Sequence, residues 1–313
     1  MAEFTIDQSK INEIVRRSYL ALEQEGKRLR KYMPQHNLPE EFEYSPRRQE
    51  VKEPELAAKF LFTEAFFERR MQSRQIIAGC LEAWRDIGQR WIFFPDKVAE
   101  KSASEIDKVM QKLPYTAHKG SSIEVSDKYQ KNCLILRDYF HSDPRKLITG
   151  KTAEEARGIM DSFWGIGNGI ANLYIAYLLE RRIAAPSDPK NALLKVDIHK
   201  ARIPLNVGAV LTTEREIRRD NLETALEKAY WHACDALGLA PEIIDGALWV
   251  IGSEICARKN YELCQLNCPL VDMCKAYTPE SRETKKFQIY NATGRRIDVR
   301  KNFGQATLFP RQF

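Results

Sequence analysis

Apolar residues recur at helical spacing along most of the chain. The first such pattern covers residues 9–33, with Ile11, Ile14, Val15, Tyr19 and Leu22 on one face. The same periodicity predicts further helices over residues 55–87, 104–112, 126–141, 152–163, 168–180, 221–237 and 241–254. Alternation typical of β-strands is nearly absent. The pattern therefore predicts an all-α fold.

Polar segments suggest how the helices are divided along the chain. A proline-containing polar stretch from Pro34 to Pro54 separates the first helix from the others and is typical of a linker or an extended arm. We therefore expect an N-terminal helix with its arm at 1–54, a helical core at 55–277 and a C-terminal tail at 278–313.

Composition limits the class of protein. Hydrophobic residues make up 43% of the chain and charged residues 29%, which is ordinary for a globular protein. No apolar run approaches the roughly 18 residues that span a bilayer. The N-terminus also lacks an apolar segment followed by a cleavage site. These features predict a monomeric cytoplasmic protein without a membrane segment.

The net charge of +6 is concentrated near the C-terminus. Residues 282–313 hold eight Lys or Arg and only two acidic residues, which equals the excess of the whole chain. Clustered positive charge favours a polyanionic partner such as nucleic acid. The alternative is a solvated tail that only aids solubility.

Four of the seven cysteines fall within a short segment, at Cys256, Cys264, Cys268 and Cys274. In a reducing compartment such crowding indicates metal ligation rather than disulfides. An all-cysteine set suits a [4Fe–4S] cluster or a structural zinc ion, but the paired CxxC knuckles typical of zinc are absent. A loop without metal would expose its thiols to oxidation. The other three, Cys80, Cys133 and Cys234, are predicted to be small core residues.

A glycine-rich turn interrupts the helical pattern at residues 161–172, which read DSFWGIGNGIAN. Gly165 and Gly167 flank Ile166, so the backbone can turn tightly while the isoleucine anchors it in the core. The turn would present backbone N–H groups at the start of a helix near Asn168, where a phosphate oxygen can bind. An ordinary connection between two helices is the alternative.

Three motifs follow one another in a recognisable order: WGIGNGIAN, then VDIH at residues 196–199, then CARKNYELCQLNCPLVDMC. In this order the chain resembles the helix-hairpin-helix-GPD DNA glycosylase superfamily, in particular the endonuclease III branch with its iron–sulfur loop. The resemblance covers residues 55–277. It implies a helical barrel domain with an iron–sulfur domain, double-stranded DNA as partner, and excision of a damaged, mispaired or modified base.

The resemblance also implies roles for individual residues. Asp197 would be the catalytic carboxylate, because cleavage of an N-glycosidic bond builds positive charge on the sugar. Its neighbours Val196 and Ile198 are expected to pack inward and lower the local dielectric. The alternative, that Asp197 caps a helix, is compatible with catalysis. The four cysteines would hold the [4Fe–4S] cluster, and the hairpin would bind DNA through Gly165, Ile166, Gly167 and Gly169.

The chain departs from the family pattern at informative places. Trp164 replaces the usual hairpin proline, the segment around residues 184–191 is longer, and two of the cysteine gaps are each one residue longer. Gly169 stands where bifunctional members carry the lysine that forms a Schiff base. The resemblance therefore points to a monofunctional glycosylase that uses water. The alternatives are a lyase that uses another amine, with Lys195 and Lys200 nearby, and a catalytically silent DNA-binding module.

Four further features carry weaker expectations. His199 either supports the local backbone or contacts a phosphate, or is an ordinary buried histidine. Arg69 and Gln72 either fill the gap left by the flipped base or belong to a solvated helix face. The terminal segment Gln305–Phe309 (QATLF) resembles the short peptide that docks on the bacterial sliding clamp. Its alternative is packing on the protein's own surface.

Overall fold

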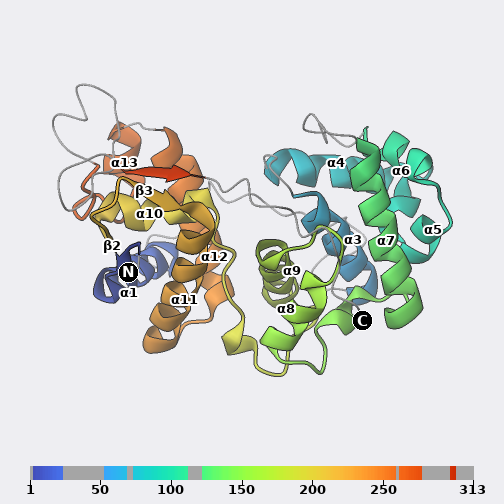
Figure 1. Ribbon diagram of the computed structural model, residues 1–313, viewed down its shortest axis with the longest axis horizontal. Helices are drawn as coiled ribbons and strands as arrows, with labels where there is room; N and C mark the ends of the chain where they lie inside the picture. The colour runs from blue at the N-terminus through green and yellow to red at the C-terminus, as the bar shows by residue number, and fades with distance from the viewer. Residues whose placement is uncertain are drawn as a thin grey trace. The chain divides into compact units, whose positions relative to one another are not determined.

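In the computed structural model the described residues are 3–23, 53–68, 73–111, 122–258, 261–276 and 297–300. Helices make up most of this part of the chain (Figure 1). They are α1 (Gln8–Glu23), α3 (Pro54–Phe67), α4 (Ser73–Arg85), α5 (Pro95–Ala99), α6 (Ala103–Met110), α7 (Ser122–Phe140), α8 (Ala153–Asp161), α9 (Asn168–Glu180), α10 (Ile198–Val207), α11 (Arg219–Leu237), α12 (Pro241–Val250) and α13 (Tyr261–Asn267). The predicted all-α fold is confirmed. None of the described helices is both long and apolar enough to cross a membrane.

Two pairs of short strands accompany these helices: β1 (Thr5–Ile6), β2 (Val210–Leu211), β3 (Glu216–Arg218) and β4 (Asp298–Arg300). The first pair is antiparallel, with Thr5 opposite Leu211, and the second is parallel, with Glu216 opposite Asp298. A piece of the predicted tail thus adds a strand beside β3.

The chain forms two compact units. The first, here the terminal unit, combines Met1–Met33 with Leu193–Ala306, and the second, the central unit, contains Pro34–Ala192. The predicted boundaries at residues 54 and 277 do not coincide with this division. The reason is that α1 packs on α11 and α12, which are about 200 residues later in the sequence.

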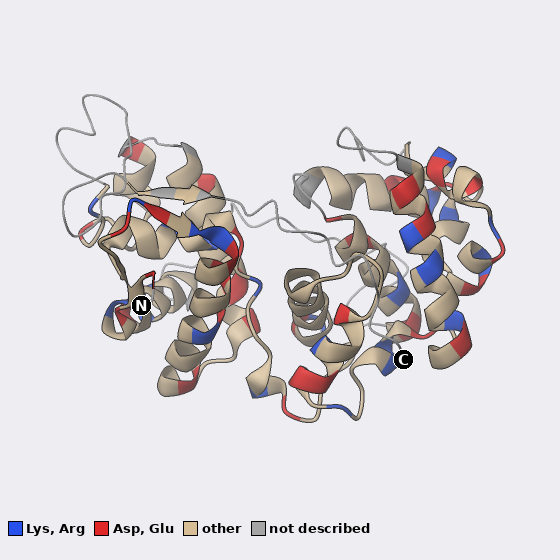
Figure 2. Cartoon of the chain, viewed as in Figure 1, with Lys and Arg blue, Asp and Glu red and all other residues tan. Residues whose placement is uncertain are grey.

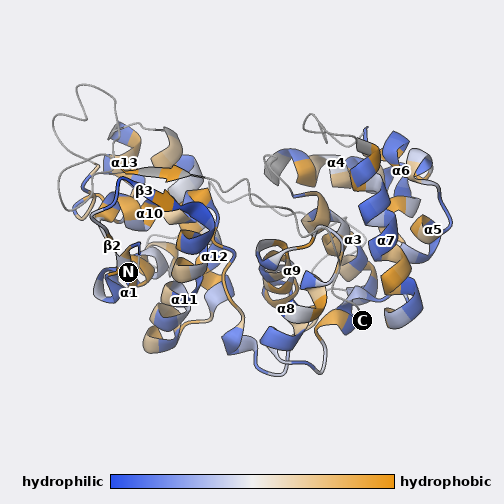
Figure 3. Cartoon of the chain, in the orientation of Figure 1, coloured by the Kyte–Doolittle hydropathy of each residue, from blue (hydrophilic) through white to orange (hydrophobic). Residues whose placement is uncertain are grey.

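The apolar face of α1 explains this packing. Ile11, Ile14 and Val15 are fully buried in the core of the terminal unit, beside Leu226 and Tyr230 of α11. Figure 3 shows polar residues on other parts of the same helix. One apolar stripe on an otherwise polar helix must be covered by another element to be stable.

The core of the central unit is built from aromatic rings. Phe60 of α3 stacks on Phe93 with centroids 5.0 Å apart and meets Trp84 edge-on at 5.8 Å. On another face of α3, Phe62 meets Tyr174 of α9 at 5.6 Å. These contacts fix α9, the helix that follows the glycine-rich turn, against α3.

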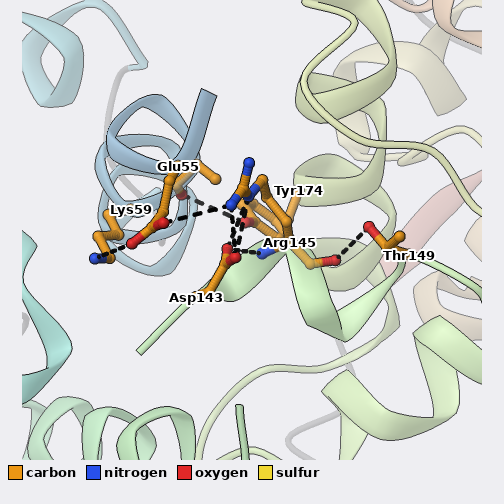
Figure 4. Close-up of polar contacts among 7 residues, drawn as sticks. Glu55, Lys59, Asp143, Arg145, Thr149 and Tyr174 are labelled. Atoms are coloured by element: carbon orange, nitrogen blue, oxygen red, sulfur yellow. Dashed lines mark hydrogen bonds and ion pairs between the residues drawn. The ribbon is translucent and has the colours of Figure 1, made fainter. Parts of the chain in front are cut away.

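A polar network supports the same pair of helices (Figure 4). Arg145 donates to Asp143 through Nε at 2.9 Å and through Nη2 at 2.7 Å, and its Nη2 lies 3.4 Å from Glu55 at the start of α3. Burial opposes ionisation of Asp143, but the Arg145 guanidinium still holds the pKa of this carboxyl below its usual value. Tyr174 donates to the carbonyl of Ala58 at 3.3 Å, which adds a direct link between α9 and α3.

Some predicted helix boundaries were wrong. The pattern over 55–87 is divided between α3 and α4, and α5 was not predicted, because a five-residue helix is too short to show periodicity. The predicted helix at 241–254 ends as α12 at Val250 and continues as a π-helix, η5 (Ile251–Ile255).

Charged pairs account for much of the polar surface of α7. Lys128 pairs with Glu124 one turn earlier, and Lys131 lies 2.7 Å from Asp127. Figure 2 shows both signs of charge along this helix. Exposed pairs of this kind stabilise a helix only slightly. They also leave this face without a strong excess of one charge.

Candidate functional site

The predicted hairpin lies between α8 and α9 in the central unit. Gly165 has a φ of +67°, a left-handed conformation that favours glycine. Ile166 is 4% exposed and belongs to the core, whereas Gly165 and Gly167 are exposed. A Cβ atom at Gly167 would meet nothing within 4 Å. The turn therefore has the anchored, open backbone that the sequence predicted.

A residue that the sequence analysis did not identify holds this turn from α7. Asn132 is fully buried, and its side-chain amide donates to the carbonyl of Trp164 at 3.0 Å while its Oδ1 accepts from the Trp164 N–H at 2.7 Å. The side-chain amide thus satisfies both the N–H and the carbonyl of Trp164, as the backbone of a neighbouring β-strand would, and so fixes the turn. The contact joins residues 32 positions apart, so no local pattern could have indicated it.

The start of α9 is open to an external acceptor. Gly167 is its N-cap residue and supplies no side-chain cap. The first N–H groups of a helix lack partners inside the helix and carry a partial positive charge. Lys131, which is paired with Asp127, contacts the turn through Trp164, with Nζ 4.7 Å from the centre of the indole ring. Gly169, the second residue of α9, offers no side chain that could react.

Asp197 lies in the terminal unit and is the N-cap of α10. Its Oδ1 accepts from the backbone N–H groups of His199 at 2.9 Å and Lys200 at 3.0 Å. The capping alternative raised from the sequence is therefore confirmed. Among the described residues, its Oδ2 accepts no hydrogen bond, so the cap orients the carboxylate while leaving one oxygen for another partner.

The surroundings of Asp197 keep it ionised. Burial opposes ionisation, but the positive charge and backbone N–H of Lys200, together with Lys195 and His199, still place the pKa of Asp197 below its usual value. Of its two neighbours, Val196 is buried as expected but Ile198 is only half-buried. The carboxylate is thus half-enclosed and negatively charged.

A second carboxyl, Glu223 of α11, lies within electrostatic range of Asp197. Burial raises the pKa of Glu223, the hydrogen bond from Arg219 opposes this shift, and the charge of Asp197 adds to it. Two neighbouring carboxyls therefore have their pKa values displaced in opposite directions.

His199 supports the backbone beside Asp197. Burial is the main cause that lowers the pKa of its imidazole. Its Nδ1 lies 3.5 Å from Nη1 of Arg202, which donates to the carbonyl of Gly252 at 2.8 Å. The ring also meets Trp249 edge-on at 6.5 Å. These contacts favour the predicted role of His199 in holding the local structure.

Helix α10 approaches η5 very closely at this point. A Cβ atom added to Gly252 would lie 2.2 Å from the carbonyl oxygen of His199 and 2.5 Å from its carbonyl carbon. Both are backbone atoms, which cannot move aside as a side chain can. Position 252 therefore requires glycine. The segment η5, which contains Gly252 and ends directly before Cys256, supports the helix α10 that Asp197 caps.

The four cysteines of the loop influence one another electrostatically. Burial, with contributions from neighbouring loop thiols, raises the pKa of Cys256 to about 12 and that of Cys264 to about 11. Burial also raises the pKa of Cys268, and the three other loop cysteines add to this shift. Among the described residues, no group of three or more Cys, His, Asp or Glu is arranged to hold a single metal ion.

The remaining cysteines have the predicted structural role, since Cys80, Cys133 and Cys234 are all buried core residues. Other predicted functional residues cannot be placed in the same way. Arg69, Gln72 and the Gln305–Phe309 segment lie outside the described residues.

Comparison with known proteins addresses the fold. No family model and no curated protein matches the sequence. Among solved structures, the chain is similar to a trapped covalent intermediate of endonuclease III with DNA, with a TM-score of 0.51 and 14% identity over 90% of this chain and 100% of that one. It is also similar to a thermostable thymine-DNA glycosylase, with a TM-score of 0.51 and 14% identity over 86% of this chain and 97% of that one. The chain shares the all-α, helix-hairpin-helix fold of these two structures.

Proposed function

We propose that this chain is a DNA base-excision glycosylase that flips out a damaged, mispaired or modified base and releases it by hydrolysis. The observation that carries the proposal is the carboxylate of Asp197, oriented by the start of α10 and held ionised beside Lys200. The fold supports the same function, because both similar structures are of DNA-processing proteins.

The chemistry required matches what Asp197 can supply. When the bond between the base and C1′ breaks, its electron pair leaves with the base and positive charge develops on the sugar. A fixed carboxylate stabilises that charge and can accept a proton from the attacking water. The open turn at Gly165–Asn168 supplies N–H groups for a DNA phosphate. We assign Arg69 and Gln72 to supporting contacts with DNA, and Gln305–Phe309 to docking on a sliding clamp. We assign His199 to holding the backbone beside Asp197.

Two observations support a monofunctional enzyme. Gly169 has no amine, and the amine of Lys200 is buried in an ion pair with Asp245. Lys195 is half-exposed, so a lyase reaction through Lys195 is the second candidate function.

The reaction product distinguishes these functions. Incubation with a panel of lesion-bearing and modified duplexes should release one class of base, identified by mass spectrometry, and leave an intact strand that breaks only after alkali or heat. Borohydride should trap little covalent complex, because a Schiff base needs an available amine. Strong trapping that disappears in Lys195→Met would establish the lyase instead. Failure to release any base would leave only the silent DNA-binding module.

We further propose that Cys256, Cys264, Cys268 and Cys274 hold a [4Fe–4S] cluster. Burial of the Cys256, Cys264 and Cys268 thiols supports this assignment, because burial opposes ionisation of the free thiols and bound iron would offset the negative charge of the thiolates. In such a cluster each cysteine binds a different iron, so the thiolates stand farther apart than the ligands of one zinc ion. The cluster would stabilise the loop that follows η5.

Iron analysis tests this assignment. Protein purified without oxygen should be brown and contain about four irons per chain. Cys268→Ala should lose most of the iron, whereas Cys234→Ala, which alters a buried cysteine outside the loop, should retain it. Stoichiometric zinc without iron in the anaerobic preparation would contradict the cluster.

A further inference from the structure

Lys200 is a buried lysine whose ammonium group has two partners. Its residue is 2% exposed, its Nζ donates to the carbonyl of Lys195 at 2.8 Å, and the same Nζ forms an ion pair with Asp245 of α12. Lysine is almost never fully buried unless it is paired, because removing the charge from water is costly.

The same residue also holds the Asp197 segment through its backbone. The Lys200 N–H donates to Oδ1 of Asp197, and the carbonyl of Lys200 accepts from the hydroxyl of Tyr230 at 3.2 Å. The bond from Nζ to the carbonyl of Lys195 holds the chain before Asp197, and the backbone hydrogen bonds of Lys200 hold the chain after it. Helices α11 and α12 thus fix Lys200, and Lys200 fixes the carboxylate.

Charge acts in the same direction as geometry. After burial, Lys200 has the largest influence on Asp197, ahead of Lys195 and His199, and it favours the ionised carboxylate. On α11, the carboxyl of Glu223 interacts unfavourably with the Asp197 carboxylate, whereas burial raises the pKa of Tyr230 and keeps its phenol neutral. On α12, the charged group facing Lys200 is Asp245, which forms an ion pair with its Nζ.

We propose that Lys200 and Asp245 form a positioning pair for Asp197, in which Lys200 orients and electrostatically supports the carboxylate and Asp245 keeps Lys200 in place. This role rests on the proposed glycosylase function. It assigns Lys200 to support of the carboxylate and not to Schiff-base chemistry, because its amine is already engaged by two partners.

The test measures the titration of Asp197 directly and then its consequence for the reaction. Carboxyl ¹³C NMR of Asp197 should show a pKa that rises by about one to three units in Lys200→Met, because a nearby opposite charge is lost. The acid limb of single-turnover base excision should move to higher pH by a similar amount. Lys200→Arg should restore both values toward those of the wild type.

Two further variants separate positioning from folding. The double variant Lys200→Gln/Asp245→Asn removes both charges but keeps groups that can hydrogen-bond, so it should fold and still show the raised Asp197 pKa. Lys59→Met removes another buried lysine, which pairs with Glu55 at 2.7 Å in the central unit, and should leave the Asp197 titration unchanged.

The outcomes are distinct. An unchanged Asp197 titration in folded Lys200→Met or in the double variant would overturn the positioning role and leave the pair as a structural contact. The NMR measurement needs no DNA, so it can succeed even if the wild type releases no base. That result would support the positioning pair and overturn the proposed function alone.

Discussion

Asp197→Asn should lower the rate of base excision by roughly 10²-fold or more, which corresponds to about 2.7 kcal/mol of transition-state stabilisation. Asparagine keeps an Oδ1 atom that can accept from the N–H groups of His199 and Lys200, so the start of α10 should be preserved. What disappears is the negative charge opposite the positive sugar. DNA binding and thermal stability should therefore change little.

Single-turnover kinetics with the best duplex of the panel measures this effect, and a salt-matched binding assay checks affinity. Asp188→Asn is a suitable control, because Asp188 also accepts a backbone N–H, from Ala153 at 2.6 Å, but lies in the central unit. It should excise bases at the wild-type rate. Full activity in Asp197→Asn would remove the carboxylate from the mechanism.

Gly252→Ala should destabilise the protein by about 3 kcal/mol, at the upper end of the range for overpacked sites. The new methyl group would meet the backbone of His199, so relief requires α10 and η5 to move apart. Such a movement would also disturb Asp197, which lies two residues before His199. We therefore expect slower excision as well as a lower melting temperature.

Thermal unfolding, with excision measured well below the transition, tests this prediction. Gly158→Ala is the matched control, because Gly158 lies within α8 and a Cβ atom there would meet nothing within 4 Å. Alanine is the better helix former, so this control should be neutral or more stable by up to about 1 kcal/mol. A wild-type melting temperature in Gly252→Ala would contradict the close packing of α10 against η5.

Local chemistry explains why part of the site could be predicted from the sequence. The helix α9 begins at Asn168 as predicted, because a glycine pair around one apolar residue allows the backbone to turn tightly at this point. Asp197 caps α10 for a similar reason, since its partners are the N–H groups two and three residues later. Such local features depend on a few adjacent residues and can therefore be predicted from the sequence.

Only the tertiary structure decided which distant residues complete these elements. Helical periodicity identifies the buried face of α1 but not the helices that cover it, so its place in the terminal unit was not foreseen. Asn132 and Trp164 are 32 positions apart, and Lys200 and Asp245 are 45 apart. Each contact forms because tertiary packing places the two residues side by side. The spacing of apolar residues shows which face of a helix is buried, but it does not show which other element covers that face.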